Sequence, residues 1–236
     1  MSNIKVLYED NHLIAVYKPA GVLSQGDKTK DISIFDEVKK YLKEKYKKPG
    51  NVFLGLVQRL DRPVSGIILF AKTSKGASRL SEQFRNHKVE KIYHALVYGK
   101  PEKSKGVLIH CLIKDEKLKK ARKSANGQEA KLYYEVVSTK SRMLDKVGIK
   151  SNENYSLLKI KIETGKFHQI RYQLSLAGFP ILGDVKYGAP FSLPDKSIAL
   201  CANSLSFKSA VEEKIIKISI KLPENWSRWL AIEDPR

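Results

Sequence analysis

The sequence of 236 residues has only two cysteines and lacks any long apolar run. Cys111 and Cys201 form no Cys-x-x-Cys pair, which argues against a disulfide framework and a cysteine-based zinc site and fits a reducing compartment. The longest apolar run, residues 66–71, is far shorter than the roughly 20 residues that a membrane helix needs. The first residues contain no apolar stretch typical of a signal peptide. We therefore expect a cytoplasmic protein without a membrane segment.

The common cofactor and metal motifs are also missing. No glycine-rich GxGxxG or GxxxxGK[ST] loop follows a strand, which argues against chemistry driven by a dinucleotide or ATP. The five histidines show no HExxH spacing, and no GxSxG nucleophile motif occurs. We expect no cofactor and no metal, so any catalysis would depend on side chains alone.

Positive charge is abundant. The 44 Lys and Arg residues outnumber the 25 Asp and Glu residues, which gives a formal net charge of +19. Such an excess favours a polyanionic partner, most often nucleic acid, although a lysine-rich surface can also serve solubility alone. The lysines are densest in residues 39–48 and 114–123. In the first cluster they alternate with apolar residues at helical spacing, which indicates the solvated face of a helix.

The hydrophobic pattern predicts many short strands and few helices, which indicates an α+β fold around a mostly antiparallel sheet. The length allows one large domain or two small ones, and we expect a single domain over residues 1–236. Strands are predicted at residues 5–7, 13–17, 52–57, 66–71, 91–99, 106–112, 130–138, 155–163, 199–206 and 214–221.

Three helices are predicted. The first covers residues 33–46, with Ile34, Val38 and Leu42 at helical spacing. The second follows Ser74, which we expect to be its N-cap, and the third covers residues 167–177. Residues 114–127 and 140–154 are polar and read as irregular connections. The first of these is either a mobile surface loop or a basic finger that follows RNA phosphates.

A polar cluster at residues 58–65 separates two apolar strands. It places the carboxylate of Asp61 between the guanidinium groups of Arg59 and Arg62. The residue types fit two readings, a salt-bridged loop or a fixed, ionised aspartate beside phosphate-binding arginines. Ser65 and Gly66 would allow a tight turn after the cluster.

Two further segments contain candidate functional residues. Residues 165–174 open a helix directly after an alternating strand, and Lys166, His168 and Arg171 at a helix start suit either an anion or an ordinary capped terminus. In residues 91–99, Lys91 and Tyr93 share one face of a strand, where a tyrosine serves either the core or an active site.

Taken together, these segments resemble the RluA-type pseudouridine synthases, which isomerise uridine in ribosomal and transfer RNA. Five motifs stand in the family's order between residues 9 and 188. They are Glu9-Asp10 with Lys18-Pro19-Ala20-Gly21, then Arg59-Leu60-Asp61 with Ser65-Gly66, Lys91-x-Tyr93, Gly165-x-x-His168-Gln169-Ile170-Arg171, and Gly183-Asp184-x-x-Tyr187-Gly188.

The sequence departs from the family pattern beside the central residues. Gln58 stands where the family usually has histidine, Pro63-Val64 replaces a pair ending in threonine, and Lys166-Phe167 stands where Arg-Thr is common. These changes spare the motif centres, so they bear on the target RNA and the rate rather than on the reaction class. The opening motif begins almost at Met1, and we expect the small N-terminal RNA-binding domain of some family members to be absent.

The resemblance implies the pseudouridine synthase fold, with helices and loops around a central cleft, and roles for individual residues. Asp61 would be the catalytic carboxylate, Arg171 its charge partner, and Tyr93 the residue that stacks on uracil. The partner would be ribosomal or transfer RNA, bound by a monomer, and the target base would leave its stack to reach Asp61. Contacts to RNA are expected from Arg59, Arg62, Lys91, Lys119, Lys120, Arg122, Lys123, Lys166, His168, Gln169 and Leu174.

Two alternatives to a uridine isomerase fit parts of the sequence. A noncatalytic RNA-binding or ribosome-assembly protein could use the same fold, but Asp61, Tyr93 and Arg171 are all in place. A methyltransferase-like RNA enzyme is disfavoured because no glycine-rich cofactor loop follows a strand.

Overall fold

The computed structural model describes residues 4–140 and 154–226, which fall into two compact units. Unit 1 comprises residues 1–91 and 202–220, and unit 2 comprises residues 92–201 and 221–236. The chain passes from one unit to the other inside β5 (Glu90–Tyr98) and returns inside β10 (Leu200–Lys208). Compact units are not in themselves separate domains, so the single catalytic domain over residues 1–236 stays a prediction.

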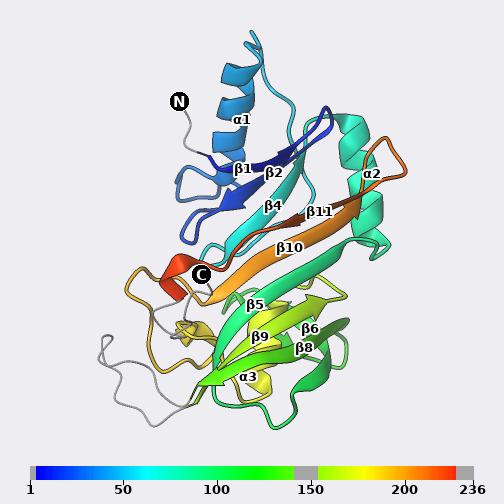
Figure 1. Cartoon of the computed structure of the whole chain (residues 1–236). Helices are drawn as coiled ribbons and strands as arrows, with labels where there is room; N and C mark the ends of the chain where they lie inside the picture. Colours follow the sequence, from blue (N-terminus) through cyan, green and yellow to red (C-terminus); the bar gives the residue numbers. More distant parts are fainter. Residues whose placement is uncertain (1–3, 141–153, 227–236) are drawn as a thin grey trace, which may run out of the picture. The chain divides into compact units, whose positions relative to one another are not determined.

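Unit 1 is a sheet with helices α1 (Ile34–Lys45) and α2 (Ser74–Arg85) (Figure 1). Its strands β1 (Val6–Glu9), β2 (Leu13–Lys18), β4 (Ser65–Ala71) and β10 lie in that order, β3 (Gly55–Leu56) pairs with β4, and β11 (Ile215–Ser219) pairs with β10. Every residue of β4 is buried, as its uninterrupted apolar sequence predicts. The core cluster of this unit includes Leu13, Leu69 and Phe207.

Unit 2 contains the sheet order β5-β9-β8-β6-β7 and the helix α3 (Gln169–Leu176). Its other strands are β6 (Lys105–Asp115), β7 (Lys120–Lys123), β8 (Gln128–Lys140) and β9 (Tyr155–Ile162). The pairings of β6 with β7, β6 with β8 and β8 with β9 are antiparallel. Two short 3-10 helices, η2 (Val185–Tyr187) and η3 (Glu224–Trp226), complete the described elements. The predicted α+β class is confirmed.

The three predicted helices are present, with corrected ends. Ser33 caps α1 through a capping box with Asp36, and Ile34, Val38 and Leu42 are buried as their spacing predicts. The N-cap of α2 is Thr73 and not Ser74, because the Thr73 hydroxyl accepts a hydrogen bond from the Gly76 amide at 3.1 Å. Helix α3 begins two residues later than predicted, at Gln169.

Two other predictions of local structure were wrong. The strand predicted at residues 52–57 is reduced to β3, and residues 114–127 are not an irregular loop. The strand β6 continues to Asp115, the chain turns, and β7 pairs back antiparallel. We call residues 114–123 the basic hairpin. The polar connection predicted at residues 140–154 lies almost wholly outside the described residues.

Within residues 4–140 and 154–226, no helix is long and apolar enough to span a membrane.

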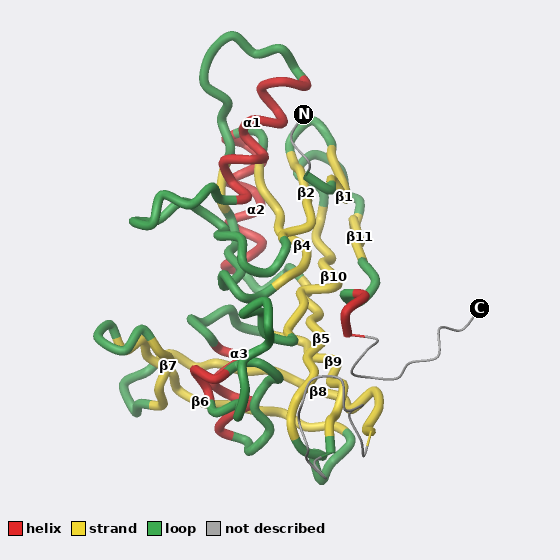
Figure 2. Tube along the Cα trace, turned by 90° about the vertical axis from the view of Figure 1, so that its left-hand side faces the viewer, coloured by secondary structure: helices red, strands yellow, loops and turns green. Residues whose placement is uncertain are grey.

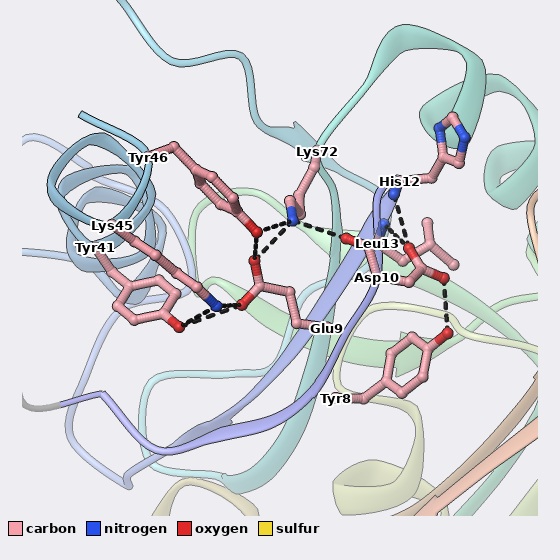
Figure 3. A network of polar contacts seen from close by, with 9 residues as sticks. All are labelled: Tyr8, Glu9, Asp10, His12, Leu13, Tyr41, Lys45, Tyr46 and Lys72. Carbon is pink, nitrogen blue, oxygen red and sulfur yellow. Dashed lines mark hydrogen bonds and ion pairs between the residues drawn. The ribbon is translucent and has the colours of Figure 1, made fainter. Parts of the chain in front are cut away.

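A single carboxylate, that of Glu9 at the end of β1, ties α1 to the sheet of unit 1 (Figure 3). Its Oε2 accepts from Lys45 at 2.6 Å and from Tyr41 at 3.2 Å, and its Oε1 accepts from Lys72 and Tyr46, both at 2.7 Å. Burial raises the pKa of Glu9, but the hydrogen bonds from Lys45, Lys72 and Tyr46 outweigh burial and lower it to about 2.

The neighbouring carboxylate of Asp10 closes the turn between β1 and β2. It accepts the amide hydrogens of His12 at 2.7 Å and Leu13 at 2.6 Å, and the Tyr8 hydroxyl at 2.7 Å (Figure 3). The Glu9-Asp10 pair of the first motif therefore has a structural task in this unit, since both side chains are engaged with neighbouring segments of the chain.

We predict that Glu9→Gln lowers the free energy of unfolding at pH 7 by about 2 kcal/mol, because charge-assisted hydrogen bonds to two lysines are weakened. The folded pKa of Glu9 lies below its ordinary value of 4.5, so this stabilisation is complete above that value and declines as the pH falls toward 2. Urea denaturation at pH 7 and pH 3 should therefore show a smaller difference between wild type and variant at pH 3. Glu44→Gln is the control, because Glu44 is exposed and lies 4.0 Å from Lys40. An equal difference at both pH values would contradict the prediction.

Candidate active site

The loop that carries Asp61 lies between β3 and β4 in unit 1, and its backbone is bonded to the loop that follows β2. The Ser24 hydroxyl donates to the Leu60 carbonyl at 2.6 Å and accepts from the Leu60 amide at 2.9 Å. The Gly21 amide donates to the Arg62 carbonyl at 2.8 Å. The residues immediately before and after Asp61 are thus both fixed through their backbones, and the position of Asp61 follows from theirs.

Beneath this loop lies Lys18, a fully buried lysine at the end of β2. Its ammonium donates to the carbonyls of Pro19 at 3.0 Å, Val22 at 2.7 Å and Arg62 at 3.3 Å. Burial lowers the pKa of Lys18 to about 7, although the charge of Asp61 acts in the opposite direction. The same lysine therefore joins the two loops and interacts electrostatically with the predicted catalytic carboxylate.

Gly66 allows this arrangement through close packing and not through the predicted tight turn. It lies within β4 at a φ of +129°, and a Cβ there would be 2.3 Å from the Ala202 carbonyl oxygen on β10. No side chain fits at that distance, so the glycine lets β4 and β10 approach each other next to the end of the Asp61 loop.

The two arginines flanking Asp61 differ in their surroundings. Arg59 is exposed on the loop, as an RNA-contacting residue would be. Arg62 is also exposed, but its Nε donates to the Gly21 carbonyl at 2.9 Å and its guanidinium lies 2.7 Å from the Asp31 carboxylate. Arg62 therefore also holds the loop after β2.

In unit 2, Arg171 and Asp184 form a buried, bidentate ion pair. Arg171 Nε lies 2.7 Å from one carboxylate oxygen of Asp184, and a second guanidinium nitrogen lies 2.8 Å from the other. The two side chains are 6% and 1% exposed, so loss of either would leave an uncompensated buried charge. Both residues stand in the quoted motifs, but no local sequence pattern pairs them.

Tyr187 packs against this pair, with the Arg171 guanidinium 5.1 Å from the centroid of its ring. The Tyr187 hydroxyl lies 2.8 Å from Nδ1 of His168. The rings of Phe167 and His168 stack with their centroids 3.8 Å apart. His168 has a left-handed backbone with a φ of 50°, a strained conformation for a non-glycine residue that the surrounding contacts maintain.

Several predicted RNA-contacting residues are buried. The Gln169 side chain accepts from the Thr164 hydroxyl and the Lys166 amide and donates to the Lys131 carbonyl, so it shapes the turn before α3 and is poorly placed to contact RNA. Leu174 is fully buried in α3. Lys91 is 8% exposed, lies 5.8 Å from the Phe84 ring centroid, and has a pKa lowered by burial.

The remaining candidates are more accessible. Lys119, Arg122 and Lys123 of the basic hairpin are exposed, while Lys120 is half-buried. Lys166 donates to the Gln128 side chain at 2.8 Å in an exposed position. Tyr93, by contrast, is buried like Lys91, with 9% exposure in β5 of unit 2. Asp61 belongs to unit 1 and Arg171 to unit 2, and their pairing stays a prediction.

We predict that, from pH 7 to pH 10, the free energy of unfolding of the wild type rises by about 1 kcal/mol or more relative to that of Lys18→Met. In that pH range Lys18 is protonated in the unfolded chain but largely deprotonated in the folded chain. This difference makes stability rise with pH in the wild type, and the variant lacks the contribution because it has no lysine there. Chemical denaturation at the two pH values measures this change. Lys40→Met, at a lysine whose side chain is 68% exposed, is the control, and a constant difference for Lys18→Met would refute the prediction.

Comparison with known proteins identifies the family. A model of the RNA pseudouridylate synthase family matches residues 12–176. The ribosomal large subunit pseudouridine synthase C of Rickettsia typhi is 35% identical over 96% of this chain and 70% of its own length. The tRNA pseudouridine synthase C of Haemophilus ducreyi is 34% identical over 94% of this chain and 93% of its own length.

The solved structures agree with the sequences. Human RNA Pseudouridylate Synthase Domain Containing 4 matches with a TM-score of 0.76 and 25% identity, over 96% of this chain and 92% of that one. Human RNA Pseudouridylate Synthase Domain Containing 1, at 19% identity, has the same fold with a TM-score of 0.74, over 97% of this chain and 88% of that one. The predicted pseudouridine synthase fold is confirmed. The chain therefore belongs to the RNA pseudouridylate synthase family and is an isomerase.

Proposed function

We propose that this chain isomerises a specific uridine of ribosomal or transfer RNA, with Asp61 as the catalytic carboxylate. The names of two relatives, one acting on ribosomal RNA and one on transfer RNA, support these substrates. The observation that carries the proposal is the backbone clamp on both sides of Asp61, made by Ser24, Gly21 and Lys18. A carboxylate that must meet one atom of a nucleotide needs such a fixed position.

The reaction breaks the bond between ribose and the ring nitrogen of uracil, turns the base, and forms a carbon–carbon bond. It is redox-neutral and needs no energy input, which is consistent with a side-chain mechanism without a cofactor. Asp61 either attacks the anomeric carbon of the ribose or removes the proton from its 2-position, and both roles require an ionised carboxylate. Arg171, whose guanidinium is oriented by Asp184, would be the charge partner of Asp61.

Other residues would manage the base. Tyr93 would stack on the uracil and accept the last proton from the ring carbon, and Leu174 would support the site from behind. The uridine has to leave its stack, at a cost of a few kcal/mol, and the exposed Arg59 would occupy the vacated space. A planar guanidinium can stack on bases and bind phosphate at the same time.

The basic hairpin would bind the RNA backbone, together with Arg62, Lys166 and His168. It gathers exposed cations on a short two-stranded element, which suits contact with successive phosphates. We further propose that the protein acts as a monomer in the cytoplasm and that residues 1–236 form one catalytic domain.

The alternative is an RNA-binding or ribosome-assembly protein without catalysis. A purely structural loop could be clamped in the same way at Asp61, so a measurement of activity has to separate the two functions. Loss of pseudouridine at one position of cellular RNA after deletion of the gene would separate the isomerase from the binder.

We predict that Asp61→Asn reduces pseudouridine formation by at least about 100-fold while RNA binding is retained, because only the reacting group is lost. Formation is measured on RNA from a strain lacking the gene, and binding by filter retention of the same RNA. Asp195→Asn, at an exposed turn, is the control. Near-normal turnover by the Asp61 variant would refute the assignment.

We also predict that neutralising Lys119, Lys120, Arg122 and Lys123 together flattens the dependence of RNA affinity on salt. Each lost phosphate contact should reduce the log–log slope by about 0.7 for single-stranded RNA. The matched control neutralises Lys40, Lys43, Lys47 and Lys48 in and after α1, which removes the same formal charge. If the two variants changed the slope equally, net charge rather than the hairpin would govern binding.

A further inference from the structure

Strand β7 of the basic hairpin has little apolar surface to hold it in place. Its sequence is Lys-Ala-Arg-Lys, and only Ala121 is buried. Among the residues that the structure describes, β7 pairs with β6 alone and ends the sheet of unit 2. A short strand at a sheet edge with so little buried area is marginal unless other bonds support it.

That support comes from two tyrosine hydroxyls. The Ala121 amide donates to the Tyr187 hydroxyl at 2.7 Å, and the Lys123 amide donates to the Tyr172 hydroxyl at 3.0 Å. Alternate amides of an edge strand point away from its partner, so Ala121 and Lys123 present their N–H groups on one edge. The two hydroxyl oxygens thus accept the hydrogen bonds that the carbonyls of a further strand would accept.

Both tyrosines belong to the elements that contain the buried ion pair. Tyr172 follows Arg171 in α3, and Tyr187 ends η2, which begins directly after Asp184. The Tyr187 ring packs on the Arg171 guanidinium, while its hydroxyl contacts both β7 and His168. Figure 2 shows α3 beside β6 and β7, in agreement with the contacts between these elements.

We propose that Tyr172 and Tyr187 are positioning residues whose hydroxyls fix the basic hairpin to the elements carrying Arg171. The inference rests on the proposed function, in which the hairpin binds RNA. Lysines on a loosely held hairpin would have to be ordered when RNA binds, and that ordering costs affinity. A hairpin that is already docked presents its charges at a constant distance from Arg171.

The test uses Tyr172→Phe and Tyr187→Phe, singly and together, in the full chain. Phenylalanine removes the hydroxyl but keeps the ring that packs on Arg171. Each single variant should weaken binding of RNA from a strain lacking the gene about fivefold, the typical effect of one lost hydrogen bond. The kcat for pseudouridine formation should stay within about twofold. Tyr133→Phe, which removes a hydroxyl bonded to Glu163 at 3.1 Å elsewhere in unit 2, should change neither value.

A second arm distinguishes positioning from general loosening of the fold. In the variant with neutral residues at Lys119, Lys120, Arg122 and Lys123, removal of the Tyr172 hydroxyl should have no further effect on RNA affinity, because that hydroxyl acts through those charges. Tyr187 is left out of this arm because its hydroxyl also contacts His168. Amide hydrogen exchange at Ala121 and Lys123 should become faster in the Tyr172→Phe and Tyr187→Phe variants and should not change in the Tyr133→Phe control. If the double variant does not fold, the single Tyr172→Phe variant decides the question.

Three outcomes would overturn the inference. One is an equal loss of affinity from Tyr172→Phe in the charged and neutralised backgrounds, and another is a fall in kcat with unchanged affinity. The third is wild-type affinity in both Tyr→Phe variants. If the charge-neutralised variant itself bound RNA like wild type, the hairpin contact in the proposed function would fail as well, and the two failures are thereby distinguished.

Discussion

The position of the Asp61 loop depends on a buried ammonium group. Lys18 contributes a cation at the end of β2 that is shared by three backbone carbonyls, one of which belongs to the residue after Asp61. Without it the carbonyls of Pro19, Val22 and Arg62 would lose these bonds, although the Arg62 carbonyl would keep the one from the Gly21 amide. The bonds from Lys18 join the two loops even though burial lowers the pKa of Lys18 to about 7, and Ser24 adds a second link at Leu60.

In unit 2, a buried ion pair fixes the position of a functional candidate. The Arg171–Asp184 pair is almost fully removed from solvent, and its bidentate geometry fixes the plane of the guanidinium. Gly183, at a φ of +84°, precedes Asp184 where a Cβ would lie 2.7 Å from the Leu193 side chain. Glycine at that position and the carboxylate after it explain why the motif around Asp184 accompanies the motif around Arg171.

The network around Tyr187 joins the arginine proposed to assist catalysis to the hairpin proposed to bind RNA. One face of its ring meets the Arg171 guanidinium, and its hydroxyl meets the backbone of the basic hairpin. Cations that are to bind RNA and the arginine proposed to assist catalysis are thus held within one unit by directional hydrogen bonds rather than by apolar packing. The departure at Lys166-Phe167 falls beside this network, where Phe167 stacks on His168.

The sequence by itself determined the helices with strong periodicity, the fully apolar strand β4, and the family through five ordered motifs. Helix α1 follows from the spacing of Ile34, Val38 and Leu42 and from the capping residues Ser33 and Asp36, all of which are local signals. Only the tertiary structure decided that residues 120–123 form a strand, since Lys-Ala-Arg-Lys has no apolar alternation and gains its partners from β6, Tyr172 and Tyr187. It also decided that Thr73 caps α2, where its hydroxyl also meets Nδ1 of His12, and that Arg171 pairs with Asp184. The bonds of Tyr187, Tyr172 and His12 join residues 66, 49 and 61 positions apart, and no local pattern encodes which of several polar side chains will meet once the chain has folded.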